Sequence, residues 1–383
     1  MEKSAGTRVA LVRCEGYDLD LVRAAVRRGL DLLGGALRFA RAGERIVLKP
    51  NLLVGRAPNR AVNTHPAVFQ ATAEALQESG ATLSYGDSPG FGPLGSAARR
   101  AGIGEVADVL GIPSADFSRG RIVNFPDGRL IKQFTIANGA LDADGLVSLP
   151  KMKTHGLTRI TGAIKNQFGC IPGVLKPEFH ARLSNVDVFS QMLVDLNRLL
   201  RPRLYVMDGI VAMEGNGPQG GSPRPMNVLL FSEDPVALDS VFCRLIDLDP
   251  ELVAPIVYGR AFELGEPENI EVVGDPLESF IAGDFDVNRR SQSTTGAPGR
   301  PSRIARRLIV PKPVIDPRRC TKCGTCVSVC PVSPKAVAFP GEGRSAPPVH
   351  HYDRCVRCYC CQELCPESAI DIRVPLLGRL IRR

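Results

Sequence analysis

The 383-residue chain contains no tryptophan, and only 5% of its residues are aromatic. It also lacks any run of about 18 apolar residues, which excludes a membrane-spanning helix. Its first residues have no apolar secretory core, so we expect a cytoplasmic protein. The hydrophobic and charged fractions, 44% and 23%, are those of an ordinary globular protein. The length allows one large domain and a small one.

Excess positive charge is confined to the C-terminal part of the chain. Residues 291–383 hold 16 Lys and Arg against 6 Asp and Glu, whereas the remainder holds 32 against 34. A basic segment is a frequent sign of nucleic-acid binding, but no nucleic-acid motif accompanies this one and aromatics are few. We therefore expect no nucleic-acid partner. An acidic electron-transfer partner or a weak contact with a membrane surface fits this charge better.

Cysteine is almost absent from the first 300 residues, because nine of the twelve cysteines fall between Cys320 and Cys365. An even number of cysteines is typical of disulfides in small secreted domains. This chain is long and has no export signal, so its cysteine cluster points to metal ligation.

Two cysteine runs have the spacing Cys-x2-Cys-x2-Cys-x3-Cys-Pro, which is that of bacterial 4Fe–4S proteins. The two-residue gaps let three thiolates surround one face of a cubane cluster, and the fourth cysteine reaches the other cluster. The spacing therefore predicts two 4Fe–4S clusters. Their predicted ligands are Cys320, Cys323, Cys326 and Cys365 for cluster one, and Cys355, Cys358, Cys361 and Cys330 for cluster two.

Zinc also binds paired Cys-x2-Cys ligands, but it leaves the third cysteine and the Cys-Pro pair of each run unexplained. Cys360 is surplus, and the three-residue gap to Cys365 selects Cys361 as the ligand. Residues 313–373 resemble the two-cluster bacterial ferredoxins. The resemblance implies a βαββαβ fold and low-potential one-electron transfer, although those ferredoxins are commonly acidic and this segment is basic.

Before these runs, strand-like and helix-like segments alternate. We expect strands at residues 8–13, 44–50, 81–86, 145–149, 203–207, 227–231 and 270–273, helices at 19–37, 64–79, 94–110, 186–200, 235–246 and 250–264, and a hairpin at 121–136. This pattern predicts an α/β fold with a mostly parallel sheet flanked by helices. The predicted divisions are an α/β domain at 1–287, a basic linker at 288–312, a small α+β ferredoxin-like domain at 313–374 and a basic tail at 375–383.

Polar side chains follow several of the predicted strands. The carboxyl ends of parallel strands form the ligand crevice of such a sheet, so these residues predict one shared site. Lysines and glycines there suit an anionic ligand. The predicted binding residues are Lys49, Asn51, Asp87, Lys151 and Asn166, and the predicted catalytic residues are His65, His155, Lys153 and Lys165.

Simpler roles exist for several of these residues. The lysine-rich segment at 151–173 also reads as a solvated loop, His65 as a local hydrogen-bonding group at a helix start, and Asp87 and Asp208 as turn caps. Cys170 reads as a core residue. The segment Gly215-Asn216-Gly217-Pro218-Gln219-Gly220 matches G-x-G-x-x-G, but its proline predicts a loop and not a dinucleotide site.

The N-terminal part resembles domain-of-unknown-function family 362 over residues 8–275. The resemblance is carried by Lys-Pro-Asn-Leu at 49–52, Thr-His-Pro at 64–66, Gly-Asp-Ser-Pro-Gly at 86–90, Lys-x-Lys-Thr-His at 151–155 and the glycine-rich segment at 161–173. Several such proteins carry an appended ferredoxin module. The family has no settled reaction, so the resemblance implies a fold and not a substrate.

These observations favour an iron–sulfur oxidoreductase in which an external carrier, such as an acidic ferredoxin or flavodoxin, supplies electrons. The two clusters then deliver them to a small anionic substrate or cofactor in the crevice, with His65 or His155 as proton donor. The alternative is a non-enzymatic electron carrier or docking subunit of a larger redox complex. A cluster-based sensor is a third hypothesis, but it lacks a DNA-binding motif.

Overall fold

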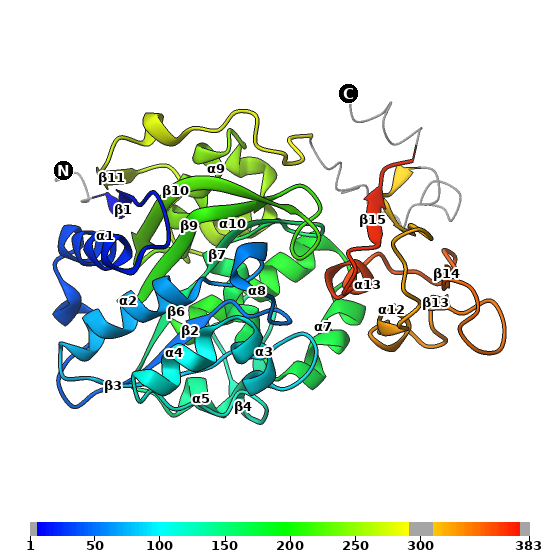
Figure 1. Cartoon of the computed structure of the whole chain (residues 1–383), viewed down its shortest axis with the longest axis horizontal. Helices are drawn as coiled ribbons and strands as arrows, with labels where there is room; N and C mark the ends of the chain where they lie inside the picture. Colours follow the sequence, from blue (N-terminus) through cyan, green and yellow to red (C-terminus); the bar gives the residue numbers. More distant parts are fainter. Residues whose placement is uncertain (1–5, 291–308, 376–383) are drawn as a thin grey trace.

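The computed structural model describes residues 6–290 and 309–375. Figure 1 shows a large α/β domain, coloured from blue to yellow, beside a smaller C-terminal module coloured orange to red. The predicted linker falls largely on residues 291–308 and the predicted tail on residues 376–383, both of which lie outside the described residues.

The centre of the α/β domain is one sheet, to which nine strands contribute within residues 6–290. The hydrogen-bonded order is β11-β1-β10-β9-β6-β2-β3, and β7 extends the sheet from β9 and pairs with β8. The bounds are β1 (Thr7–Arg13), β2 (Arg45–Pro50), β3 (Thr82–Tyr85), β6 (Gly145–Leu149), β7 (Lys151–His155), β8 (Arg159–Thr161), β9 (Leu204–Glu214), β10 (Ser222–Ser232) and β11 (Ile270–Gly274).

The pairing of these strands confirms the predicted, mostly parallel sheet. β9, β6, β2 and β3 run parallel to one another, as do β1 and β11, while β10 is antiparallel to both of its neighbours. β9 and β10 are longer than predicted and form a hairpin of eleven residues on each side. Its turn holds the Gly215–Gly220 segment, so the loop interpretation of that motif is confirmed.

Helices cover both faces of the sheet (Figure 1). Side chains alternate across each strand, so Tyr205 and Met207 enter one core while Leu204 and Val206 enter the other. One face carries α1 (Leu19–Leu32), α2 (Pro66–Gln77), α3 (Leu94–Arg100) and α4 (Ile103–Val109). The other carries α6 (Ala163–Asn166), α8 (Val186–Leu200), α9 (Pro235–Leu245) and α10 (Ala254–Ala261), with α7 (Lys176–Arg182) near its edge.

Several element boundaries differ from the predictions. The helix predicted at 19–37 ends at Leu32, because Gly34 and Gly35 both adopt positive φ angles. Gly102, at φ +73°, divides the segment predicted as one helix at 94–110 into α3 and α4. The segment at 151–173, also read as a solvated loop, instead forms β7, β8 and α6, and it is mostly buried.

Two further strands, one short helix and several 3-10 turns complete the described part of the α/β domain. The predicted hairpin is present as β4 (Gly120–Asn124) and β5 (Gln133–Ala137), which pair antiparallel and are followed by α5 (Asn138–Leu141). Short 3-10 turns lie at Ala36–Arg38, Pro58–Arg60, Gln167–Cys170, Gly173–Leu175, Pro250–Leu252 and Leu277–Phe280. Within the described ranges, every helix is too short or too polar to cross a bilayer.

The C-terminal module has the strand and helix order that the ferredoxin resemblance implies. Its elements are β12 (Lys312–Ile315), α12 (Thr325–Ser328), β13 (Val337–Ala338), β14 (Val349–His350), α13 (Cys360–Glu363) and β15 (Ile370–Arg373). β12 pairs with β15 and β13 pairs with β14, both antiparallel. The outer strands therefore bring the two ends of the module together, and the predicted βαββαβ arrangement is confirmed.

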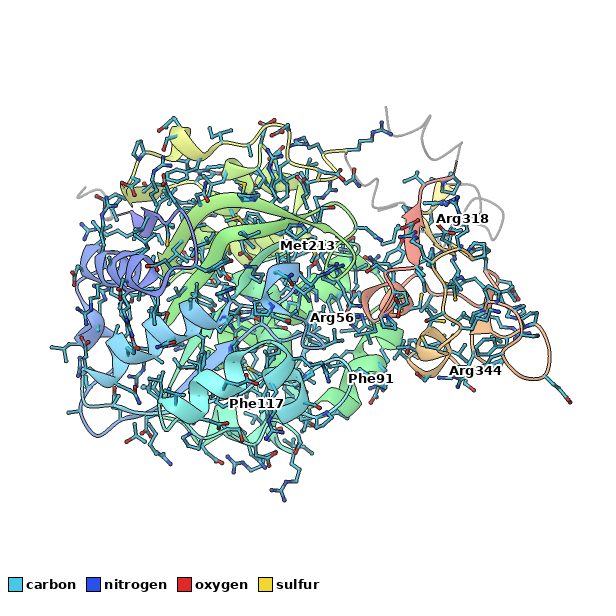
Figure 2. The ribbon with its side chains drawn as sticks, in the orientation of Figure 1. Arg56, Phe91, Phe117, Met213, Arg318 and Arg344 are labelled. Atoms are coloured by element: carbon cyan, nitrogen blue, oxygen red, sulfur yellow. The ribbon has the colours of Figure 1, made fainter. Side chains whose placement is uncertain are left out.

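The module docks on the α/β domain through the turn of the β9–β10 hairpin. The Gln362 side-chain amide donates hydrogen bonds to Asn216 and to the Gly217 carbonyl, and the Gln219 amide donates to the carbonyl of Cys365. Arg56, which Figure 2 places between the two parts, donates to the Pro366 carbonyl at 2.7 Å. These contacts hold α13 against the edge of the sheet.

Candidate functional site

The strand-end residues converge at the edge of the sheet, as predicted from their order along the chain. Lys49, at the end of β2, places its Nζ 2.9 Å from a carboxylate oxygen of Asp87, which follows β3. Both side chains are buried. The other carboxylate oxygen of Asp87 accepts a hydrogen bond from the backbone N–H of Leu52. This ion pair therefore ties the loop after β2 to the loop after β3.

A second set of polar side chains continues this network towards β7 and α6. Lys153 donates to Asn51 Oδ1 at 2.8 Å and to the carbonyl of Val62 at 2.6 Å. Asn51 donates in turn to Asn166, whose amide also binds Ser148. Burial lowers the pKa of Lys153 well below its ordinary value, and the nearby cations Lys165 and Lys151 lower it further.

Lys151 belongs to a separate group, here called the Asp208 cluster, which comprises Tyr17, His65, Lys151 and Asp208. Lys151 Nζ lies 2.6 Å from Asp208 Oδ2 and 2.9 Å from the Tyr17 hydroxyl, which donates to Asp208. The His65 ring stacks on Tyr17 with centroids 3.5 Å apart. Lys151 and Asp208 are at most 1% exposed. Every charge in this cluster is therefore already compensated.

His65 has a local role at the start of α2, which agrees with its interpretation as a local hydrogen-bonding group. The structure makes His65, and not Thr64, the N-cap of α2, because its Nδ1 accepts from the Ala67 N–H at 3.2 Å. Thr64 instead accepts from the Asn51 N–H. Burial lowers the pKa of His65 to about 4, so its imidazole is neutral at pH 7.

A cavity of about 790 Å³, counted to its open mouth, lies between the α/β domain and the C-terminal module. We call it the lysine cavity, because Lys153, Lys165 and Lys176 line it. Five predicted site residues are among its walls: Asn51, Asp87, Lys153, Lys165 and Asn166. The module contributes Val329, Cys360, Glu363 and Leu364. Lys49, Lys151, His65 and His155 lie behind or beside this lining.

Several polar groups of the lysine cavity have no partner among the described residues. Lys165 makes no hydrogen bond or ion pair there, and the Nδ1 atom of buried His180 has no hydrogen-bond partner. Burial lowers the pKa of Lys165, an effect that nearby Glu363 opposes. Burial also lowers the pKa of Lys176 to about 8 and that of His180 to about 4. Lys176 donates to the carbonyl of Ser88, whereas Lys165 is a desolvated cation without a partner among the described residues, which suits it to an anionic ligand.

His155 contacts the module at Glu363, a residue of the cavity wall. Its Nε2 is 3.0 Å from a carboxylate oxygen of Glu363, although the two groups are not aligned as a hydrogen bond. Its Nδ1 accepts from the N–H groups of Leu157 and Thr158, which leaves the ring proton on Nε2. Burial lowers the pKa of His155 to about 4. A neutral His155 thus points its N–H towards the module.

The eight cysteines predicted as ligands gather around two further cavities in the module. Cys320, Cys323, Cys326 and Cys365 line one of about 320 Å³, and Cys330, Cys355, Cys358 and Cys361 line another of about 330 Å³. These sets match the two predicted for the clusters, fourth-cysteine exchange included. Within the described ranges, no three His, Cys, Asp or Glu side chains converge on a single ion position. Thiols spread around a cavity fit a cubane better than a zinc ion.

Four titratable residues of the lysine cavity were not predicted as site residues: Lys176, His180, Cys360 and Glu363. A signal for the first two exists, since Lys176-Pro177-Glu178-Phe179-His180 follows the glycine-rich segment directly. Cys360 and Glu363 could not be predicted, because the sequence does not reveal where the module docks on the α/β domain. Cys170 is fully buried, and burial raises its pKa to about 12, in keeping with a core role.

Comparison with known proteins identifies both parts of the chain. Residues 46–244 match the family described as domain of unknown function (DUF362), and residues 312–366 match a 4Fe-4S dicluster domain. The thylakoid-associated protein sll1697 of Synechocystis sp. strain PCC 6803 is 37% identical over 299 residues, covering 75% of this chain and 92% of that protein.

Among solved structures, the lactate racemase apoprotein of Thermoanaerobacterium thermosaccharolyticum is similar over 61% of this chain, with a TM-score of 0.38 and 14% identity. The chain spans about half the length of that protein, 55%. The match over half of the chain and the relative at 37% identity decide the family. The chain belongs to the DUF362 family and joins to it an iron–sulfur domain of the 4Fe–4S type, which gives it a redox role.

Proposed function

We propose that this protein is an oxidoreductase in which two 4Fe–4S clusters deliver electrons to a small anionic molecule bound in the lysine cavity. The observation that carries the proposal is the shared wall of that cavity. Lys165 and Lys176 face it from the α/β domain, while Cys360 and Val329 face it from the module. These two module residues are the sequence neighbours of Cys361 and Cys330, two predicted ligands of cluster two.

The bound clusters would supply single electrons at low potential. The residues of the chain have separate tasks. Lys165 and Lys176 bind the negative charge of the ligand, and Lys153 is held behind them by Asn51 and Val62. Reduction of an organic ligand also consumes protons. The neutral imidazoles of His155 and His180 are the groups beside the cavity placed to hold one, and we propose them as proton carriers.

The experiment compares anaerobically purified wild-type protein with Lys165→Met by native mass spectrometry. We expect the wild type to retain a small anionic compound and the variant to lose at least 90% of it, because Lys165 has no other partner. The retained compound is then added back to protein whose clusters were photoreduced with deazaflavin. We expect it to reoxidise wild-type clusters and to leave those of Lys165→Met reduced.

Lys132→Met is the matched control, because Lys132 is an exposed lysine of the α/β domain far from the cavity lining. It should retain the compound at the wild-type level. If the wild type holds no compound, or if a retained compound fails to oxidise the clusters, the oxidoreductase proposal is wrong.

A second candidate function is a non-enzymatic carrier or docking subunit of a larger redox complex. The thylakoid association stated for the Synechocystis relative favours it, since that name places the relative at a membrane. Under this proposal the protein works at a membrane surface. The sequence, in contrast, predicted a cytoplasmic protein. Anaerobic co-purification of a stable redox complex, with an empty lysine cavity, would support this function over the enzymatic one.

A further inference from the structure

The two cysteine sets differ in their access to solvent. In the cluster-one set Cys323 is exposed, Cys320 is half-buried and the other two cysteines are buried, whereas in the cluster-two set Cys355 is half-buried and the other three are buried. Val329 and Cys360, which face the lysine cavity, are sequence neighbours of the cluster-two cysteines Cys330 and Cys361. Of the eight predicted ligands Cys323 is the most accessible, so the turn that carries it is the most open point of entry for an electron from outside.

Two cations flank this exposed turn without a carboxylate partner in the described part of the chain. Lys322 is half-buried and donates to the carbonyl of Ser345 at 2.7 Å. Arg344 is exposed and donates to the carbonyl of Cys323 at 2.7 Å. Both side chains use backbone oxygens as acceptors, so their full positive charge remains available to a partner. Figure 2 shows Arg344 on the part of the module that faces away from the α/β domain.

The nearby acidic groups do not cancel this charge. Asp316 and Asp371 are engaged by Arg319, at 3.2 and 2.6 Å. Glu367, which lines the cluster-one cavity, and Glu342, in the loop of Arg344, are exposed at the margin. Arg318 is also exposed, but its guanidinium lies 3.5 Å from Asp316 and is therefore not a free cation. The described part of the module, residues 309–375, holds nine Lys and Arg against six Asp and Glu, so its net charge is positive.

From this arrangement we infer that Lys322 and Arg344 form the docking surface for a small acidic one-electron carrier protein. The inference rests on the proposed function, because it supplies the electrons which that function consumes. The carrier loses one electron and the cluster-one end of the module gains it, with no bond made or broken. Opposite charges around an exposed redox centre speed the encounter and orient it, which is how electrostatic complementarity acts in transient complexes.

The first test measures binding and not turnover. Isothermal titration calorimetry at low ionic strength follows the affinity of oxidised plant-type [2Fe–2S] ferredoxin, an acidic carrier, for cluster-loaded protein. We expect Lys322→Glu/Arg344→Glu to weaken binding at least tenfold, and we expect 0.5 M NaCl to remove the difference, because salt screens exposed charges. The matched control Arg41→Glu/Lys132→Glu reverses the same charge on the exposed surface of the α/β domain and should bind like the wild type.

The second test separates docking from damage to the cluster. Iron content and reduction by photoexcited deazaflavin should equal those of the wild type, while reduction by the ferredoxin should slow at least tenfold. If the double reversal loses iron, Lys322→Gln/Arg344→Gln replaces it, with a smaller loss of affinity expected. Neither readout needs a ligand in the lysine cavity, so failure here is distinguishable from failure of the proposed oxidoreductase.

An anionic membrane is the competing occupant of the same face. Co-sedimentation with phosphatidylglycerol vesicles decides between the two. If the charge reversal abolishes vesicle binding and leaves the ferredoxin affinity unchanged, the face is a membrane contact and the inference is wrong. Unchanged ferredoxin affinity without any vesicle binding overturns it equally.

Discussion

Lys151 and Lys165 lie fourteen residues apart at the same edge of the same sheet, yet their surroundings are opposite. Lys151 is fully enclosed in the Asp208 cluster, with a carboxylate at 2.6 Å and a tyrosine hydroxyl at 2.9 Å. Lys165 faces the lysine cavity and has no hydrogen bond or ion pair with any described residue. A lysine at the carboxyl end of a strand is therefore not by itself a ligand-binding group. Whether such a lysine stabilises the fold or binds a ligand depends on whether it already has a partner within the protein.

The comparison predicts that the two lysines respond oppositely to removal. Lys151→Met leaves the carboxylate of Asp208 buried and without its cation. Loss of one member of a buried ion pair typically costs about 3–5 kcal/mol. We expect the urea midpoint of unfolding of the anaerobic, cluster-loaded protein to fall by an amount that corresponds to this loss of free energy.

The double variant Lys151→Met/Asp208→Asn tests the reason for this loss. Asparagine removes the buried charge. Its side-chain oxygen still accepts the hydrogen bond that Asp208 receives from the backbone N–H of His65. We expect the double variant to recover at least half of the lost stability. A double variant as unstable as Lys151→Met alone would show that packing, and not the uncompensated charge, is responsible.

The lysine cavity should also make the stability of the protein sensitive to acid. Burial holds the pKa of His180 at about 4, and Lys165 and Lys176 disfavour a further positive charge there. An unfolded histidine titrates near 6.5, so the unfolded chain takes up the proton first as the pH falls. Stability is then complete above about pH 6.5 and is lost towards pH 4, by at most about 1.4 kcal/mol per pH unit for one site.

His180→Leu checks this pH dependence, because it removes the titration and keeps an apolar side chain against Phe189, on which His180 stacks. Urea midpoints between pH 7 and pH 5 should fall less steeply for the variant than for the wild type. Equal slopes would mean that His180 takes up its proton in the folded state as readily as in the unfolded one.

Local sequence patterns predicted the cysteine sets of the module and the sheet of the α/β domain. The cysteine runs specify which thiols meet, because ligand spacing is a short-range property, and the structure gathers both predicted sets around separate cavities. Strand periodicity likewise anticipated the sheet, and the order of its strand ends anticipated the meeting of Lys49 with Asp87. Helix ends were less predictable: positive φ at Gly34 and Gly102 shortened or divided two predicted helices.

Local sequence patterns could not predict that Lys151 has an ionic partner and that Lys165 has none among the described residues. Asp208 is 57 residues from Lys151 along the chain, and Glu363 is 208 residues from His155. Such pairs depend on which strands become neighbours and on where the module docks. The same long-range packing explains why Cys360 and Glu363 were not recognised as walls of the cavity, although both lie within the cysteine run.

The lysine cavity, unlike the Asp208 cluster, depends on the docked position of the module. Gln362 donates to the carbonyl and side-chain oxygens of Asn216 and to the carbonyl of Gly217. Gln362→Leu should loosen this contact by about 1 kcal/mol, a typical net value for a buried hydrogen bond. Hydrogen exchange should rise at residues 215–220 and stay constant in β6 and β9. Gln133→Leu, which removes a glutamine contact in the β4–β5 hairpin, is the matched control and should leave exchange at 215–220 unchanged.

The smallest change in stability is expected at Lys165 itself. Lys165→Met removes a desolvated cation that has no partner, so unfolding should shift by less than about 1 kcal/mol in the absence of ligand. The result sharpens the comparison because the same substitution at Lys151 costs several times more. If Lys165→Met proves as destabilising as Lys151→Met, then Lys165 serves the fold by holding Glu363 of the docked module, and the cavity has no free cation there with which to bind a ligand.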